Sequence, residues 1–360
     1  MPESAKSSTQ TDDSLWTVVL AGGIGSRFWP VSTRERPKQL LPLASERPLI
    51  VDTLERAQAL VPEQRLRILA GSHLARPFRA QLQGFSDEVY WIEPQARGTC
   101  PVLAWAAWEI HRTDPDAVMV SLHADHRIHP ISSFQRTIQT AVQIARRDDL
   151  LVCIGAVPDR VETGFGHVER GEGLETSDDI AAHRVHAFHE KPDAETAERY
   201  VRDGYLWNTG LFVWKVSTFL SEVAEHAPEV YECLTVLDGG GESAVESFFA
   251  AVPACSVDTA VMERSRRVGT VTALFSWDDV GSWEALSRTR PADADGNVLI
   301  GDAVSVDGSG NIAFVDQGEV VLFGVDDLVV VRTGETTLVM PRGRVPDMKA
   351  LLAELAGDDV

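Results

Sequence analysis

The stretch that decides the fold of this chain is Leu20-Ala-Gly-Gly-Ile-Gly-Ser-Arg27-Phe-Trp-Pro30, with Pro37-Lys38-Gln39 close behind it. It follows an apolar segment, 15–20, which is typical of a buried parallel strand. A strand that runs into glycines exposes backbone N–H groups at the carboxyl edge of its sheet, where phosphates bind. Arg27 and Lys38 add positive charge suited to a triphosphate. The stretch therefore predicts a nucleotide held by its phosphates, with a turn formed by Gly22, Gly23 and Gly25.

Two other glycine motifs fit this turn less well. Gly23-x-Gly25 matches the first two glycines of a dinucleotide fingerprint, but Phe28 stands where the third glycine belongs. A Walker A loop would need Gly-Lys-Ser/Thr at a spacing that the chain does not have. A plain tight turn would have no use for Arg27, so the phosphate cradle is the favoured interpretation.

Composition and length bound the class of protein. The chain has 360 residues and is 44% hydrophobic, which suits one large soluble domain or two. No apolar stretch approaches the roughly 20 residues that span a bilayer, and the polar segment 1–14 reads as a frayed tail rather than a secretory signal. The cysteines are few, far apart and without a CxxC pair, so a reducing cytoplasm is expected: Cys100, Cys153, Cys233 and Cys255.

The net charge of −21 argues against binding to nucleic acid or to an anionic membrane. The same charge would repel a triphosphate. The segment 27–38 is an exception, because it holds four cations, Arg27, Arg34, Arg36 and Lys38, against one acid, Glu35. A divalent metal would offset the repulsion further.

The first half of the chain alternates strand-like and helix-like segments. Strands are expected at 17–20, 66–70, 89–92, 117–122 and 151–157, and helices at 49–60, 99–112 and 133–147. Such alternation predicts an α/β fold with a doubly wound, mainly parallel, Rossmann-like sheet. Past Arg290 the pattern changes to short β-rich pieces, at 298–300, 312–315, 320–323, 328–332 and 337–340, before a last helix at 348–355. We therefore expect a large α/β domain over 15–290 and a small β domain, solenoid-like and ending in a helix, over 291–360.

Two aspartates are candidate metal ligands. Asp125 follows the buried strand 117–122, which places its carboxylate at the same sheet edge as the glycine turn, where it suits Mg²⁺. Asp279, in Trp277-Asp-Asp-Val-Gly-Ser-Trp283, is either a second metal carboxylate or a helix cap, and spacing does not decide between them. A zinc site built on the histidines before and after Asp125 is an alternative, but neither a cysteine nor an HExxH pattern supports it: His123, His126 and His129.

Polar groups beside later strands suit a sugar phosphate. Glu190 and Asn208 can make bidentate hydrogen bonds to sugar hydroxyls, and Lys191 can bind a phosphate, although each is as readily part of a turn. Gly166 ends a glycine turn that lets the backbone approach a ligand closely.

Taken together, these pieces resemble the mannose-1-phosphate guanylyltransferases, also called GDP-mannose pyrophosphorylases, of the sugar-nucleotidyltransferase superfamily. The likeness runs in order along nearly the whole chain and includes the motifs above together with Glu93-Pro-Gln-Ala-Arg-Gly-Thr99, Ala124-Asp-His126, Glu162-Thr-Gly-Phe-Gly166, Glu190-Lys-Pro192, Trp207-Asn-Thr-Gly210 and Asp258-Thr-Ala-Val-Met-Glu263. The Arg-Phe-Trp-Pro, Trp-Asn-x-Gly and Trp-x-Asp-Val-Gly-Ser-Trp forms point to the mannose and guanosine branch.

The resemblance implies a role for each candidate residue. GTP would be held by the glycine turn, Arg27 and Lys38, with Glu93, Arg97 and Thr99 near the guanine. Mg²⁺ would be bound by Asp125 and Asp279. Mannose 1-phosphate would be held by Gly166, Glu190, Lys191 and Asn208. The reaction implied is the formation of GDP-mannose and pyrophosphate by attack of the sugar phosphate on the α-phosphorus of GTP.

The chain departs from the family pattern at Gly98, where Asn is usual, and at His123, where Pro is usual. It also lacks the fused isomerase domain of bifunctional relatives, so a single activity is expected. Three rival functions stay open: another hexose-1-phosphate nucleotidyltransferase, using glucose 1-phosphate with UTP or dTTP; a non-catalytic regulatory subunit that binds sugar nucleotide; and, more distantly, a nicotinamide-dependent oxidoreductase. The oligomeric state is open, and a homodimer through the C-terminal β segment is one option.

Overall fold

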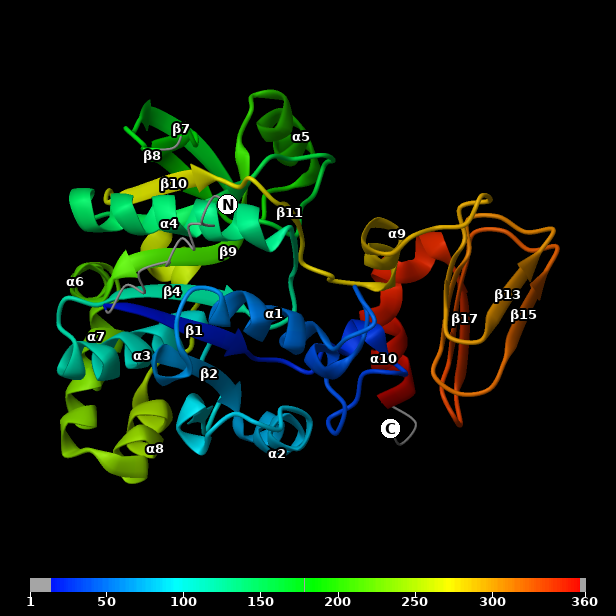
Figure 1. The fold of residues 1–360 in the computed structure, drawn as a ribbon, viewed down its shortest axis with the longest axis horizontal. Helices are drawn as coiled ribbons and strands as arrows, with labels where there is room; N and C mark the ends of the chain where they lie inside the picture. Colours follow the sequence, from blue (N-terminus) through cyan, green and yellow to red (C-terminus); the bar gives the residue numbers. More distant parts are fainter. Residues whose placement is uncertain (1–13, 178, 357–360) are drawn as a thin grey trace, which may run out of the picture.

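A nine-stranded sheet runs through the larger part of the molecule in the computed structural model, which describes residues 14–177 and 179–356 (Figure 1). Its order is β3-β2-β1-β4-β9-β6-β10-β8-β7. All of these strands except β8 and β9 point the same way, so the mainly parallel sheet is confirmed. The strands are β1 Leu15–Ala21, β2 Leu66–Gly71, β3 Tyr90–Glu93, β4 Val118–His123, β6 Leu151–Ala156, β7 His167–Gly173, β8 Ala182–His189, β9 Leu206–Lys215 and β10 Val268–Thr272.

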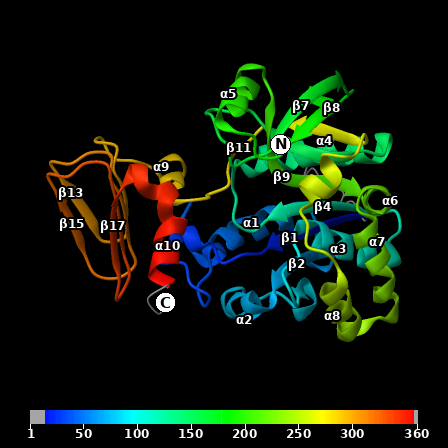
Figure 2. The same cartoon turned by 180° about the vertical axis from the view of Figure 1, so that it is seen from behind.

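Helices cover both faces of this sheet, as the doubly wound prediction requires (Figure 2). In β1, Val18 and Leu20 enter the core on one face, and Val19 and Ala21 enter the core on the other. Successive strand residues point to opposite faces, so a strand buried on both sides is a continuous apolar run. The helices are α1 Leu49–Gln58, α2 Ser72–Gln81, α3 Thr99–Thr113, α4 Ile131–Asp148, α5 Ala194–Arg202, α6 Val216–His226, α7 Pro228–Leu234, α8 Gly241–Ala251, α9 Leu286–Thr289 and α10 Met348–Ala356.

The β-rich end of the chain forms a separate stack of short strands, which confirms the predicted C-terminal β fold. Two parallel ladders, β12-β14-β16 and β13-β15, face each other, and β17 closes the first ladder antiparallel. Asn311 links successive coils, since its side chain donates to Val325 O at 2.8 Å and accepts from Leu328 N at 3.0 Å. The strands are β12 Val298–Ile300, β13 Ala303–Val306, β14 Ile312–Val315, β15 Val320–Phe323, β16 Leu328–Arg332 and β17 Thr337–Pro341, and β13 is one that the sequence analysis missed.

A third hydrophobic core joins the two parts. Phe28, Leu41 and Leu43, from the segment after β1, pack in one cluster with Trp283 and with residues of β12, β14, β16 and β17. Arg290 reinforces the joint by donating to the carbonyl oxygens of three residues of the same segment, at 2.6–2.9 Å: Pro42, Leu43 and Ser45. The segment after the glycine turn, residues 28–45, is therefore held against the C-terminal stack.

The predicted domain boundary near Pro291 falls between α9 and β12. Of the predicted tail, 1–14, all but Ser14 lies outside the described residues. Among the helices that the structure describes, none is both long enough and apolar enough to cross a bilayer.

Candidate active site

The glycine turn after β1 is shaped by its neighbour Lys38. Gly23 and Gly25 have φ values of 78° and 75°, in the left-handed region that favours glycine. A Cβ on Gly25 would lie 2.3 Å from the Cβ of Lys38, so no other residue fits there. Gln39 also holds the glycine turn, because its Nε2 donates to Gly22 O at 2.9 Å and to Gly23 O at 3.2 Å.

Lys38 joins the two aspartates that the sequence singled out. Its Nζ lies 2.8 Å from Asp125 Oδ2 and donates to Asp279 O at 2.9 Å. The Lys38 side chain is only 8% exposed, so this ammonium is held in one place by its partners. Two segments far apart in the chain, at the end of β4 and after β11 (Ser276–Asp278), are thereby brought to the glycine turn.

The charged groups around Lys38 shift the pKa values of both aspartates. Burial alone would raise the pKa of Asp125, but Lys38, His126 and His123 outweigh it and lower the pKa to about 2. The pKa of Asp279 is raised by burial, with Lys38 opposing the rise. Asp125 is therefore a carboxylate throughout the physiological range, next to a second acidic side chain.

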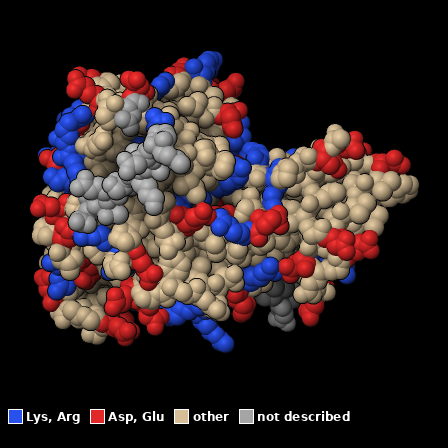
Figure 3. Space-filling model, viewed as in Figure 1, with Lys and Arg blue, Asp and Glu red and all other residues tan. Residues whose placement is uncertain are grey.

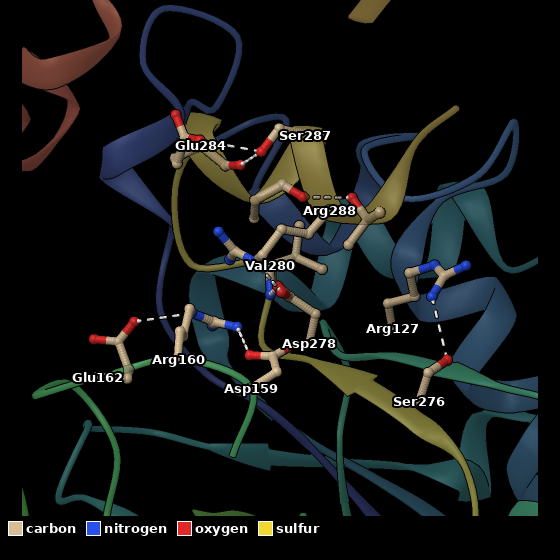
Figure 4. Close-up of polar contacts among 12 residues, drawn as sticks. Arg127, Asp159, Arg160, Glu162, Ser276, Asp278, Val280, Glu284, Ser287 and Arg288 are labelled. Atoms are coloured by element: carbon tan, nitrogen blue, oxygen red, sulfur yellow. Dashed lines mark hydrogen bonds and ion pairs between the residues drawn. The ribbon is translucent and has the colours of Figure 1, made fainter. Parts of the chain in front are cut away.

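Of the neighbouring pair Asp278 and Asp279, only Asp279 lines the cleft that Arg27 also lines. Asp278 is buried and fully engaged: it accepts from Val280 N at 2.7 Å and from Arg288 Nε at 2.7 Å (Figure 4). These bonds hold Val280 at φ 46°, a strained value for a β-branched residue, and backbone strain of this kind clusters at functional sites. Asp278 thus shapes the turn that presents Asp279.

Two histidines flank Asp125, and the third lies apart. The rings of His123 and His126 stack at 4.5 Å, and each can offer a nitrogen within 4.8 Å of an Asp125 oxygen. His126 Nδ1 accepts from Trp277 Nε1 at 3.2 Å, and burial lowers the pKa of both histidines. His129 is exposed on β5 (Arg127–His129), where it pairs with Ser276, so the three histidines of the zinc alternative do not converge.

The predicted sugar-phosphate residues form a second cluster. Asn208 N donates to Gly166 O at 2.8 Å, and a Cβ on Gly166 would lie 2.7 Å from Glu190 Oε2. Glu190 Oε1 pairs with Lys191 Nζ at 2.7 Å. Asn208 lies within β9 rather than beside a strand, and Gly210, at φ 71°, follows it.

Two acids that were given no role in the sequence analysis support this cluster. Asp258 Oδ1 accepts from Asn208 Nδ2 at 2.9 Å, and Glu263 Oε1 accepts from Glu190 N at 2.8 Å. Burial, with a further contribution from Glu190, raises the pKa of Asp258 to about 6. Both acids belong to the motif 258–263, which was quoted for the family resemblance but gave these two residues no function.

The segment 93–99 contacts a different part of the molecule. Arg97 Nε donates to Phe249 O at 2.7 Å, at the end of α8, and Thr99 Oγ1 accepts from Val257 N at 2.9 Å. Burial raises the pKa of Glu93 to about 7. Gly98 has φ 85°, and a Cβ there would lie 2.4 Å from Cys255 O, so glycine is dictated by the backbone.

A cleft of about 970 Å³ opens between the large and small parts of the molecule. Arg27, Lys191 and Asp279 line it from the large part, which places the cation predicted for the nucleotide, the cation predicted for the sugar phosphate and one predicted metal ligand on the same cavity. Figure 3 shows several Lys and Arg side chains at the junction of the two parts, while acidic side chains are spread over both.

We expect Asp258→Asn to stabilise the protein at pH 8 and to have a much smaller effect at pH 4.5. The folded pKa of about 6 lies above the unfolded value near 4, so the carboxyl of Asp258 costs stability progressively as the pH rises from 4 to 6, and the full cost is present above pH 6. The gain should be on the order of 1–2 kcal/mol, because the side chain is partly exposed and Asn keeps the acceptor for Asn208. Unfolding in urea at the two pH values measures it, and an equal effect at both would contradict the assignment.

Known proteins share this combination of fold and sequence. The family model described as nucleotidyl transferase matches residues 16–296, and that of the MannoseP isomerase/GMP-like beta-helix domain matches 301–355. The fold is thus that of the nucleotidyl transferases.

Individual relatives indicate which family of nucleotidyl transferases the chain belongs to. Mannose-1-phosphate guanylyltransferase of Klebsiella pneumoniae is 37% identical over 345 residues, which cover 93% of this chain and 72% of that protein. The enzyme of the same name from Escherichia coli K12 is 34% identical over 356 residues, 96% of this chain and 74% of the relative. A crystal structure described as mannose-1-phosphate geranyltransferase from Thermus thermophilus matches with a TM-score of 0.86 at 31% identity, over 95% of this chain and 99% of that one. This chain belongs to the mannose-1-phosphate guanylyltransferase family.

Proposed function

We propose that this chain makes GDP-mannose and pyrophosphate from GTP and mannose 1-phosphate. The observation that carries the proposal is the junction of Lys38, Asp125 and Asp279 beside the glycine turn, on a chain of this family. The names of the relatives supply the base and the sugar, and the residues supply a place where two phosphorylated substrates can meet.

In the proposed reaction, an oxygen of the sugar phosphate attacks the α-phosphorus of GTP in line. A bond forms between that oxygen and the α-phosphorus, the bond from the α-phosphorus to the bridging oxygen breaks, and pyrophosphate leaves. The protein needs no nucleophile for this, so its work is to position two polyanions and to offset their repulsion. Arg27 and Lys38 serve the nucleotide phosphates, and Lys191 serves the phosphate of the sugar.

Asp125 and Asp279 fit a divalent metal. Both offer hard carboxylate oxygens, and the depressed pKa of Asp125 keeps it ionised. When bound there, Mg²⁺ would supply positive charge to the phosphates. Lys38 Nζ, which contacts Asp125, adds a cation of the protein's own at the same place.

Two of the residues proposed to bind mannose 1-phosphate, Asn208 and Glu190, are already fixed by hydrogen bonds within the protein. Asp258 fixes the amide of Asn208, and Glu263 fixes the backbone of Glu190, so neither group must be ordered on binding. The Glu190 carboxylate, already paired with Lys191, is suited to accept from sugar hydroxyls.

Pyrophosphate release across a panel of nucleoside triphosphates and hexose 1-phosphates tests the proposal. We expect GTP with mannose 1-phosphate to give the highest kcat/KM by about tenfold or more, since a site built around one set of polar contacts discriminates against substrates that lack them. A preference for glucose 1-phosphate with UTP or dTTP would assign a different sugar nucleotide. Binding of GDP-mannose without any pyrophosphate release would indicate a regulatory subunit.

A further inference from the structure

The active-site cleft has a wall that comes from the C-terminal domain. Besides Arg27, Lys191 and Arg288, its lining includes two cations from the end of the chain, Arg342 and Lys349. Lys349 lies on α10, and the family model for the β-helix domain spans it. The sequence analysis assigned no functional residue to this domain.

The cations of this wall differ in whether they already have a partner. Three are engaged: Lys191 with Glu190 at 2.7 Å, Arg288 with Asp278 at 2.7 Å, and Arg342 with Glu284.

Arg27 and Lys349 are the two lining cations for which the described residues offer neither a hydrogen bond nor an ion pair. In a chain of net charge −21, two unpaired cations on one cleft mark a place for an anion.

Lys349 lies on the nucleotide side of the cleft. Helix α10 packs against η1 (Ser26–Phe28), the turn that carries Arg27 (Figure 1). Met348, the residue before Lys349, is buried in the core that also contains Phe28. The helix that carries Lys349 is therefore fixed relative to the phosphate loop, while the long lysine side chain remains exposed and free to reach a ligand.

We propose that Lys349 binds the β- and γ-phosphates of the nucleoside triphosphate, and the pyrophosphate that they become. This deepens the proposed function and rests on it. Two cations on facing elements, one on each domain, would hold the terminal phosphates between them, so the C-terminal domain would be part of the substrate site rather than an appendage.

The test compares Lys349→Gln with Lys349→Arg and with Arg344→Gln in the full chain. Arg344 is a matched control, because it is an exposed cation close by, pairs with Asp347, and does not line the cleft. Two measurements are made: the kinetics of both reaction directions, and calorimetric titration of GTP and of pyrophosphate, each with Mg²⁺ present.

For Lys349→Gln we expect the KM for GTP and for pyrophosphate, and the corresponding dissociation constants, to rise about tenfold, as for loss of a charge-assisted hydrogen bond. The KM for mannose 1-phosphate should change less than about twofold, because its phosphate is assigned to Lys191. Lys349→Arg should stay close to the unmodified protein, and so should Arg344→Gln.

Equal dissociation constants for Lys349→Gln and Arg344→Gln would overturn the proposal, and so would a rise confined to the sugar phosphate. If the unmodified protein bound GTP but released no pyrophosphate, the proposed function would fail by itself, and the titrations would still decide the role of Lys349.

Discussion

Asp125→Asn is expected to abolish turnover while leaving the chain folded. The substitution keeps the shape of the side chain but removes the negative charge that Lys38 Nζ contacts at 2.8 Å. Asp125 is an ion-pair partner of Lys38 and, in the proposed reaction, a metal ligand, so we expect kcat to fall by at least about 10³-fold. Steady-state pyrophosphate release with saturating Mg²⁺ measures the loss.

The stability of this variant separates chemistry from folding. The folded pKa of Asp125 is depressed, so its stabilisation is present above the unfolded value near 4 and disappears as the pH falls towards 2. Asn at 125 should therefore lower the free energy of unfolding at pH 7 by about 1–3 kcal/mol, without preventing folding.

Asp116→Asn is the control for this change, since Asp116 is exposed at the other end of β4 and should affect neither activity nor stability. Turnover by Asp125→Asn within tenfold of the unmodified protein would remove Asp125 from the mechanism.

Arg27→Ala is expected to have the next largest effect, a fall of about 10²- to 10³-fold in kcat/KM. Arg27 is exposed, has no hydrogen bond or ion pair within the described chain, and lines the cleft beside Asp279. Removing it should cost phosphate binding and transition-state stabilisation but leave thermal stability unchanged. The kinetics of GTP consumption and a thermal unfolding curve together measure this.

Arg34→Ala removes the same charge from the same cationic segment. Arg34 is exposed but does not line the cleft, so we expect only a small loss from the weaker overall field. If Arg27→Ala and Arg34→Ala behaved alike, the phosphate cradle would be a general field effect and not a contact made by Arg27.

Several parts of the site were predictable because they depend on local chain geometry. The parallel strand, the glycine turn and Arg27 follow one another directly, and Asp125 comes just after β4. Since parallel strands end at a common edge, placing Asp125 near Gly25 needed only the strand assignment. The mainly parallel sheet was predicted from the alternation of strand-like and helix-like segments, and the C-terminal β fold from a series of short β-rich pieces, which are also local patterns. The homodimer remains a prediction.

Other parts depend on contacts between distant segments. Asp278 and Asp279 are identical in type and adjacent in sequence, yet Arg288 and the Val280 backbone engage the first and leave the second on the cleft. Asp258 reaches Asn208 across fifty residues, and no local pattern signals that pairing. Lys349 is an ordinary surface lysine until α10 packs on the Arg27 turn.

By itself the sequence determined the parallel sheet, the glycine turn at its edge and the kinds of charge gathered there. These features depend on the conformational preference and hydrophobicity of residues that are neighbours in the sequence. Tertiary structure alone decided which of two aspartates faces the substrate, which cations remain unpaired, and that the last helix forms a wall of the cleft. These outcomes follow from side chains meeting across long stretches of chain, and the third core that joins the two parts sets where they meet.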